Sequence, residues 1–293
     1  MSIPSLTLRD GKTIPLLAFG TGTTWFKAGS ASLDNHLVQT TKAAIQKGFY
    51  HLDCAEMYGT DEEVGIAIKE AGVPREKLFV TNKVSNNIHD IRGAVEQGLK
   101  KMQLDYFDLY LIHSPHFAKS DADLQQAWKE MEQIKKSGKA RSIGVSNYLR
   151  PHIEATLKTA VEPPVINQLE YHPYLQRANG FVPWMQQNGI QVASYKGLTP
   201  AVRCPQGPLH EPLVKMAKAH GRDVSAAAIL LAWMMQTNIV AVTTTTKTER
   251  LDEYALALGV TLTPEEVQEI SDLGATYHLR MSWVQFYEKN DRS

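Results

Sequence analysis

Eight short apolar segments alternate along this chain with amphipathic stretches, and this alternation limits the possible folds more than any other feature. The expected strands are residues 17–20, 49–54, 78–84, 107–113, 141–147, 164–171, 190–195 and 239–243. The expected helices, with apolar residues at three- and four-residue spacing, are residues 33–47, 61–70, 88–102, 122–137, 150–159, 179–187, 225–236 and 247–258. Strict alternation favours a parallel sheet covered by helices, and eight units favour closure into an α/β fold of the (β/α)8 TIM-barrel type.

An N-terminal β-hairpin precedes the first of these units. Residues 6–8 and 13–16 flank Asp10 and Gly11, and Asp-Gly between two apolar runs predicts a hairpin with a type I′ turn. We expect this hairpin to cover one end of the barrel.

Two extra helices are expected outside the alternation, at residues 211–220 and 264–273. The second begins after Thr263, and Glu266 three residues on completes a capping box. Because no linker-like or low-complexity segment interrupts residues 1–293, we predict a single domain.

Composition restricts the partners and the compartment. Lys plus Arg and Asp plus Glu both total 31, so no net charge attracts nucleic acid or anionic lipid. Cys54 and Cys204 are the only cysteines and lack metal-ligand spacing, which favours a reducing compartment. The N-terminus does not resemble a signal peptide, and the apolar run at residues 226–235 is too short to span a bilayer. We therefore expect a cytoplasmic monomer or weak oligomer that does not bind membranes.

Four polar residues identify the candidate site. Asp53, Lys83 and His113 each lie at the downstream end of an expected strand, and Tyr58 follows five residues after Asp53. In a closed parallel barrel these strand ends meet at the C-terminal rim, where such folds carry their chemistry. A phenol, an ammonium, a carboxylate and an imidazole at one point are suited to protonating a carbonyl oxygen while another group supplies hydride.

Several motifs resemble those of the aldo-keto reductases. The run GFYHLDCAEMYG at residues 48–59, followed by EVG, resembles the first signature of that family. In the same order follow Lys83, LIH at residues 111–113, GVSN at residues 144–147 and NQLEYHPY at residues 167–174. The similarity extends over residues 6–275 and implies NADPH-dependent reduction of aldehydes or ketones to alcohols. Fungal ketoreductases that act on conjugated polyketones and ketopantoyl lactone share this general appearance.

The resemblance assigns roles that agree with the chemistry of the four side chains. A free tyrosine has a pKa of about 10, so we expect the Lys83 ammonium to lower the pKa of Tyr58. A shift of about two units corresponds to about 2.7 kcal/mol. Asp53 would keep Lys83 charged and oriented, Tyr58 would be the general acid, and His113 would donate to the carbonyl oxygen.

The glycine-rich run of Gly20 and Gly22 does not match the dinucleotide-binding fingerprint that opens a Rossmann helix. The resemblance instead implies a cofactor that extends across the barrel mouth. The residues expected at its nicotinamide end are Thr23, Thr24, Ser146, Asn147, Gln168 and Tyr195, the last by stacking on the ring. An alternative for Ser146 and Asn147 is a helix cap before Arg150.

The other end of the cofactor is expected at residues 244–250. Lys247 and Arg250 lie in the expected first helical turn, whose exposed N–H groups already carry about half a positive charge, so an anion is needed there. Thr244, Thr245 and these two cations would bind a 2′-phosphate, which favours NADPH over NADH. Where many family members have Pro-Lys-Ser, residues 243–245 are three threonines, so Lys247 would replace the usual lysine. Alternatively, Glu249 and solvent offset the charges.

The expected substrate pocket is largely aromatic. It combines two residues of the first loop, three that follow the catalytic histidine and one of the C-terminal segment, namely Trp25, Phe26, Ser114, His116, Phe117 and Trp283. Aromatic walls suit flat carbonyl compounds. These loops have no obvious arginine to bind a substrate carboxylate, which favours a neutral ketone, diketone or keto-lactone. Trp25 could equally be a core anchor.

Two other functions remain open from the sequence. His51, Asp53, His113 and His116 could be metal ligands of a hydrolase on the same barrel. The chain could also be a non-catalytic nucleotide-binding subunit, like family relatives that accompany potassium channels. The complete set of four polar residues favours the reductase, with no metal.

Overall fold

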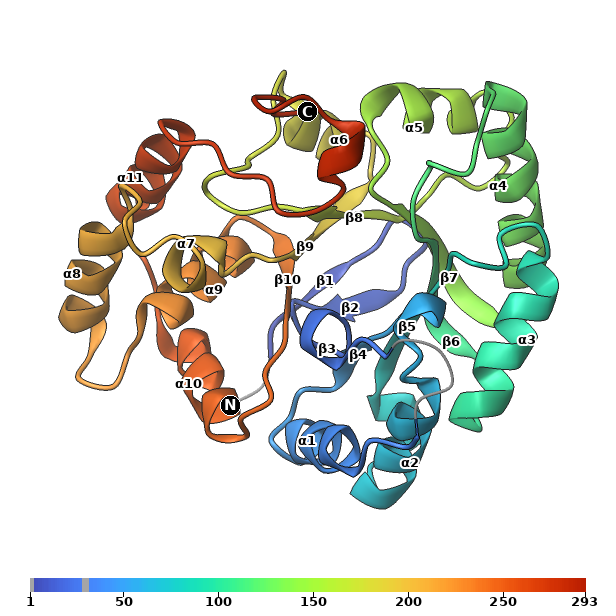
Figure 1. Cartoon of the computed structure of the whole chain (residues 1–293), viewed down its shortest axis with the longest axis horizontal. Coiled ribbons are helices and arrows are strands. Elements are labelled where there is room, and N and C mark those ends of the chain that lie inside the picture. The colour runs from blue at the N-terminus through green and yellow to red at the C-terminus, as the bar shows by residue number, and fades with distance from the viewer. Residues whose placement is uncertain (1–2, 28–31) are drawn as a thin grey trace.

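The computed structural model describes residues 3–27 and 32–293 and contains a closed barrel of eight parallel strands (Figure 1). The barrel strands are β3 (Leu17–Gly20), β4 (His51–Asp53), β5 (Phe79–Val84), β6 (Phe107–Ile112), β7 (Ala140–Ser146), β8 (Ile166–Glu170), β9 (Gln191–Tyr195) and β10 (Ile239–Thr243). They pair in sequence order, and Ala241 of β10 lies beside both Leu17 of β3 and Ser194 of β9 to close the ring. The predicted (β/α)8 barrel is therefore confirmed.

Helices surround the barrel, as Figure 1 shows. They are α1 (Asn35–Gln46), α2 (Asp61–Ala71), α3 (Ile91–Met102), α4 (Asp121–Lys136), α5 (Arg150–Leu157), α6 (Phe181–Gln187), α7 (Thr199–Val202), α8 (His210–His220), α9 (Ala226–Gln236), α10 (Glu249–Ala255) and α11 (Pro264–Ala275). The two predicted extra helices are α8 and α11, whereas the short α7 was not predicted. The expected helix at residues 247–258 instead begins at Glu249 and ends in a 3-10 turn, Leu256–Gly259.

The core explains why some elements are apolar along their whole length. Every residue of β5 and β6 is buried, because the helices cover one face of these strands and the barrel interior the other. Helix α9 is apolar around its full circumference, and its residues from Ala227 to Met235 are buried because it packs between α8 and β10.

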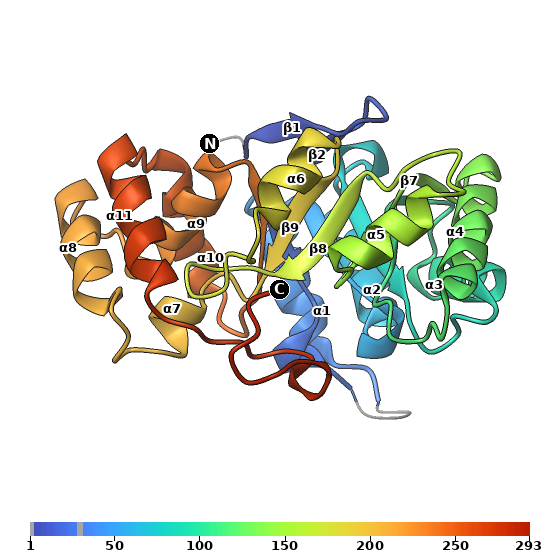
Figure 2. The ribbon, with the colours of Figure 1, turned by 90° about the horizontal axis from the view of Figure 1, so that it is seen from above.

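The hairpin pairs β1 (Ser5–Thr7) with β2 (Thr13–Pro15) and lies at one end of the barrel, opposite the C-terminal segment (Figure 2). Its turn is not the predicted type I′ turn. The Gly11 N–H donates to the Leu8 carbonyl at 2.9 Å, and Gly11 is left-handed (φ 79°) while Asp10 is not. Asp10 accepts a hydrogen bond from the Ser142 hydroxyl at 2.8 Å, which attaches the turn to β7.

The barrel and its helices share a hydrophobic cluster that extends from Leu8 to Ile270. This continuity agrees with the single-domain prediction, which stays a prediction, as do the cytoplasmic location and the oligomeric state. Among residues 3–27 and 32–293, no helix is both long and apolar enough to cross a bilayer.

Candidate active site

The four expected catalytic residues converge at the C-terminal rim of the barrel. Lys83 is fully buried, and its Nζ lies 2.6 Å from Oδ1 of Asp53 and 2.8 Å from the Cys54 carbonyl. The same nitrogen is 5.2 Å from the centre of the Tyr58 ring, and the His113 ring lies edge-on to that ring at 5.6 Å. They meet because β4, β5 and β6 are adjacent parallel strands whose carboxyl ends lie at one edge.

Tyr58 lies in a 3-10 turn, Glu56–Tyr58, that two contacts hold in place. The Glu56 carboxylate accepts hydrogen bonds from the backbone N–H groups of Ser85 (2.8 Å) and Asn86 (3.0 Å), which joins the turn to the loop after β5. On the other side, a Cβ added to Gly22 would lie 2.8 Å from Cζ of Tyr58. The phenol ring therefore packs directly on backbone, and only glycine leaves room for it.

Burial dominates the ionisation of this group. It raises the pKa of Tyr58 above its usual value of 10, although the Lys83 ammonium acts to lower it. Our expectation of a lowered phenol pKa is therefore wrong for the protein by itself. Burial acts to lower the pKa of Lys83, but Asp53 and Tyr58 act the other way and raise it. Burial, and then Lys83, hold the pKa of His113 well below 6.5. At neutral pH the site therefore contains a protonated phenol, an ammonium and a neutral imidazole.

Four of the residues expected near the nicotinamide are hydrogen-bonded to the catalytic group or to one another. The Gln168 amide donates to Oδ2 of Asp53 at 2.7 Å, and the Asn147 amide donates to the His113 carbonyl at 2.9 Å. Tyr195 donates to Oδ1 of Asn147 at 2.6 Å, and Ser146 donates to the Gln168 carbonyl at 2.8 Å. These bonds fix the wall next to the catalytic residues.

The alternative role of Ser146 and Asn147 as a helix cap has no support. Helix α5 begins at Arg150, and the residue before it, Leu149, donates its N–H to Nδ1 of His152 at 3.1 Å. Asn147 adopts a left-handed backbone conformation (φ 60°) that turns its side chain into the network described above.

A cavity of about 620 Å³ extends from Tyr58 along the rim to Arg250. The residues of the predicted cofactor site that line it are Thr23, Thr24, Tyr195, Thr244, Thr245 and Arg250. The hydroxyl of Thr244 is buried and has no hydrogen-bond partner among residues 3–27 and 32–293, so it can bind a ligand. Lys247 is exposed and is not a lining residue, and its backbone N–H and carbonyl both bond to the Thr245 hydroxyl.

The sequence analysis missed two cations that line the same cavity, Lys196 and Arg203. With Arg250 they share a lining whose only carboxylate from the described part of the chain, Asp53, is already paired with Lys83. Within the described ranges, none of the three has a carboxylate within 4.0 Å. The surplus of positive charge fits an anionic dinucleotide. The sequence signal that could have indicated the first of these cations is the Lys-Gly pair directly after Tyr195.

Aromatic residues surround the other side of the catalytic group. The Trp283 ring lies 6.4 Å from that of His113 and 5.1 Å from that of His116. Phe26 lies edge-on to Tyr58 at 6.4 Å. Phe286, which the sequence analysis missed, stacks on His116 at 3.7 Å. These rings cluster beside Tyr58 and His113.

The other expected pocket residues show no ring contact with Tyr58 or His113 within the described ranges. Trp25 is 5% exposed and packs against His36 at 5.3 Å, which agrees with a core anchor rather than a pocket wall. Phe117 is half-buried and packs against the hydrophobic cluster. Ser114 is half-buried directly after His113.

The metal-ligand alternative conflicts with existing bonds. The two ring nitrogens of His51 lie 3.1 Å from the Pro15 carbonyl and 3.0 Å from the Thr81 hydroxyl. The Asp53 carboxylate is bonded to Lys83 and Gln168. In the part of the chain that the structure describes, no group of three possible ligands is suitably placed for a metal ion.

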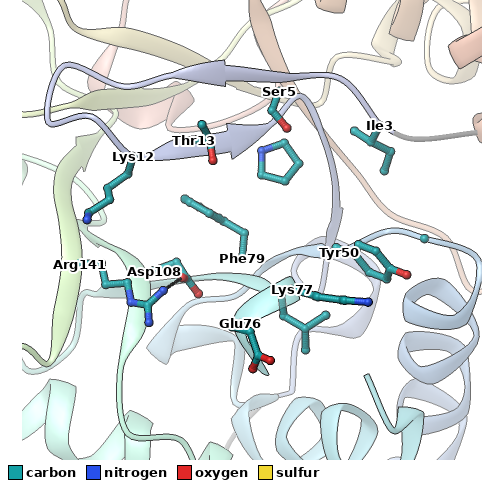
Figure 3. A pocket seen from close by; sticks show the side chains of 13 residues that line it. Ile3, Ser5, Lys12, Thr13, Tyr50, Glu76, Lys77, Phe79, Asp108 and Arg141 are labelled. Carbon is teal, nitrogen blue, oxygen red and sulfur yellow. Dashed lines mark ion pairs between the residues drawn. The ribbon is translucent and has the colours of Figure 1, made fainter. Parts of the chain in front are cut away.

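A second cavity of about 590 Å³ lies at the hairpin end of the barrel (Figure 3). Lys12, Phe79 and Arg141 are among its lining residues. Asp108, a lining carboxylate like Glu76, is paired with Arg75 at 2.7 Å and Arg141 at 3.6 Å. None of the four catalytic candidates lines it, so we place the chemistry at the opposite end.

Comparison with known proteins identifies the family. The sequence profile described as the aldo/keto reductase family matches residues 16–203. The chain belongs to this family. This aldo-keto reductase is 41% identical over 272 residues to the NAD/NADP-dependent indole-3-acetaldehyde reductase of Schizosaccharomyces pombe, covering 92% of this chain and 95% of the relative. It is 36% identical over 296 residues to the NADPH-dependent alpha-keto amide reductase of Saccharomyces cerevisiae, covering 97% and 95%.

Solved structures agree with the family and the fold. The Bombyx mori aldo-keto reductase in complex with NADP aligns with a TM-score of 0.82 and 32% identity, covering 93% of each chain. An aldo-keto reductase from a Medee basin deep-sea metagenome aligns with a TM-score of 0.84 and 29% identity, covering 96% and 98%. The predictions of an aldo-keto reductase and of an oxidoreductase are confirmed, and NADPH as cofactor agrees with the names of these relatives.

Proposed function

We propose that this aldo-keto reductase reduces neutral, flat carbonyl compounds to alcohols with NADPH, and that Tyr58 is the general acid. The observation that carries this proposal is the buried ion pair of Lys83 and Asp53 (2.6 Å) beneath the phenol, next to the cation-lined cavity. Bound NADPH supplies the hydride that the protein cannot. Tyr195, Thr244, Arg250, Lys196 and Arg203 are suitably placed to hold it.

Each protein residue then has one task at the carbonyl oxygen. Tyr58 is protonated at neutral pH, because burial raises its pKa, and it donates that proton as negative charge develops on the oxygen. The resulting phenolate is stabilised by Lys83, which Asp53 keeps charged. Neutral His113 donates a hydrogen bond to the same oxygen and orients the carbonyl.

The substrate class follows from the walls. Trp283, Phe286 and Phe26 favour a planar group beside the carbonyl. Two relatives are named for an indole acetaldehyde and an alpha-keto amide, which are both neutral carbonyl compounds. We therefore propose that the substrates are aromatic aldehydes, ketones, diketones or keto-lactones.

The test combines a substrate panel with the Tyr58→Phe variant. NADPH consumption with an aromatic aldehyde, an α-keto amide, a diketone and a keto-lactone should show turnover by the wild-type protein. Tyr58→Phe should lower kcat by about 10² to 10⁴-fold and leave the NADPH Kd unchanged, since only the acid is lost. The control is Tyr50→Phe, at the hairpin-end cavity. NADPH binding without turnover of any carbonyl would instead indicate the nucleotide-binding subunit.

A further inference from the structure

Glu170, the last residue of β8, connects the barrel to the C-terminal segment. Its side chain is buried, with 1% exposed. One carboxylate oxygen accepts a hydrogen bond from the backbone N–H of Met281 and the other from that of Ser282, both at 2.7 Å. Because hydrogen bonds to a carboxylate are short and strong, this pair holds the backbone of the C-terminal segment at a defined place.

The residue held next to this contact is Trp283. Its backbone is left-handed (φ 59°), a conformation that costs a residue with a Cβ about 1 kcal/mol or more. The indole lies 6.4 Å from the ring of His113 and 5.1 Å from that of His116. Since this orientation is unfavourable for an unsupported chain, the contacts before Trp283 have to maintain it.

A second attachment holds the far end of the segment. The Ala178 N–H donates to the Arg292 carbonyl at 2.7 Å, and Arg177 donates to the backbone oxygen of Ser293. Arg280 donates to the same oxygen at 2.6 Å. Figure 1 shows the segment crossing the barrel mouth near β8 and α6. Residues 283–290 therefore lie over the rim between two attachment points, one at Glu170 and one at residues 177–178.

The surroundings of Glu170 favour its charged form. Burial acts to raise its pKa, but His172, 3.3 Å away, and the N–H groups of Met281 and Ser282 lower it below the usual value. Burial also lowers the pKa of His172, so this ring is neutral near pH 7 and can donate to the carboxylate. The Nε of Arg177 donates to the Glu170 carbonyl at 3.1 Å. A carboxylate has acceptors on both oxygens, and a neutral amide has only one.

We propose that Glu170 is a positioning residue for substrate selectivity: by holding Met281 and Ser282 it presents the Trp283 indole as the wall opposite the catalytic residues. Glu170 does not touch the reacting atoms and acts through Trp283. The indole then favours planar, bulky carbonyl compounds over small aliphatic aldehydes. This inference rests on the proposed carbonyl reductase function.

The first test is Glu170→Gln, which keeps the size of the side chain and turns one acceptor into an N–H donor. KM for an aromatic aldehyde should rise about tenfold, the effect of losing one charge-assisted hydrogen bond. Values of kcat/KM for propionaldehyde and the Kd for NADPH should change less than twofold. The matched control is Glu269→Gln, an exposed position on α11 that should change none of these values.

A double-mutant cycle tests whether Glu170 acts through the indole. In a Trp283→Ala background, Glu170→Gln should have no further effect on the ratio of kcat/KM for the aromatic and the aliphatic aldehyde. Additive effects of the two substitutions would overturn the proposal, because Glu170 would then act by another route.

Hydrogen exchange gives a readout that does not need turnover, and its wild-type part does not depend on whether a variant folds. The N–H groups of Met281 and Ser282 should be protected, and Glu170→Gln should accelerate their exchange. Unprotected amides in the wild-type protein, or equal losses by Glu170→Gln for both substrates and for NADPH affinity, would overturn the positioning role. A wild-type protein that reduces no carbonyl would contradict the proposed function instead, whatever the exchange shows.

Discussion

The side-chain amide of Gln168 donates a hydrogen bond of 2.7 Å to Oδ2 of Asp53, while Lys83 occupies Oδ1 at 2.6 Å. Both oxygens of this buried carboxylate are therefore engaged, and Asp53 affects the phenol through Lys83. The bond uses one of the two N–H donors of the Gln168 amide, a residue that the sequence analysis placed at the nicotinamide end of the cofactor. Gln168 thus belongs to the support of the catalytic group as well as to the proposed cofactor wall.

Removing the ammonium should change the pH dependence of the reverse reaction. Lys83 is the largest influence that lowers the pKa of Tyr58, so Lys83→Met should raise that pKa further. Alcohol oxidation needs the phenolate as base, and its rising limb should therefore move to higher pH. The measurement is kcat/KM for oxidation across alkaline pH. If the rising limb of the Lys83→Met profile lies at the same pH as in the wild type, Tyr58 is not the titrating group.

The close packing of Gly22 on the Tyr58 ring predicts a catalytic defect from one added methyl group. Gly22 has φ −86°, which alanine also adopts, so Gly22→Ala should act only through the 2.8 Å contact with Cζ. Displacing the phenol by about 1 Å should lower kcat about 10²-fold with NADPH affinity nearly unchanged. Gly259→Ala, where a Cβ meets nothing within 4 Å, is the control. Equal activity of the two variants would contradict the packing argument.

The two cations predicted for the 2′-phosphate should differ, because Arg250 lines the cavity and Lys247 does not. Arg250→Ala should raise the Kd for NADPH about 10- to 100-fold, the range for losing a hydrogen bond to a charged group, and that for NADH less than twofold. Lys247→Ala should change both little. Fluorescence titration with each dinucleotide measures these constants. Equal losses of NADPH and NADH in Arg250→Ala would remove Arg250 from the 2′-phosphate.

The buried His51 should make the free energy of unfolding depend on pH. Burial lowers the pKa of His51 from 6.5 to about 4, so the unfolded chain binds the proton more readily. The contribution of His51 to the free energy of unfolding is fully present above about pH 6.5. It is lost as the pH drops toward 4, which lowers the free energy of unfolding by about 3 kcal/mol. His51→Gln should be less stable than wild type at neutral pH but lose less on acidification. Urea unfolding at neutral pH and near pH 4 measures the free energy of unfolding of both proteins. Equal losses on acidification in the wild type and in His51→Gln would exclude His51 as a source of the pH dependence.

Sequence patterns predicted the barrel and the catalytic candidates because both depend on local regularities. Apolar runs of strand length placed Lys83 and His113 at strand ends, and parallel pairing brings such ends to one rim. The wrong turn type shows the limit of a local signal. Asp10-Gly11 suits two kinds of hairpin turn, and the left-handed Gly11 after an Asp10 that is not left-handed belongs to the other kind.

Contacts between distant segments were not predictable in the same way. No pattern in one stretch of sequence indicates that Glu170 meets Met281, or that Arg203 and Arg250 line the same cavity. Burial also reversed the expected pKa direction of Tyr58, since an ammonium neighbour is visible in the motif and desolvation is not.

The order of apolar and polar residues alone determined that this chain forms eight strand–helix units with Asp53, Tyr58, Lys83 and His113 at one rim. Only the tertiary structure decided which backbone supports the phenol, which cations line the cavity and where Trp283 lies. The physical reason is that side-chain periodicity is a property of neighbours in the chain, whereas burial and long-range hydrogen bonds depend on which segments pack together in space.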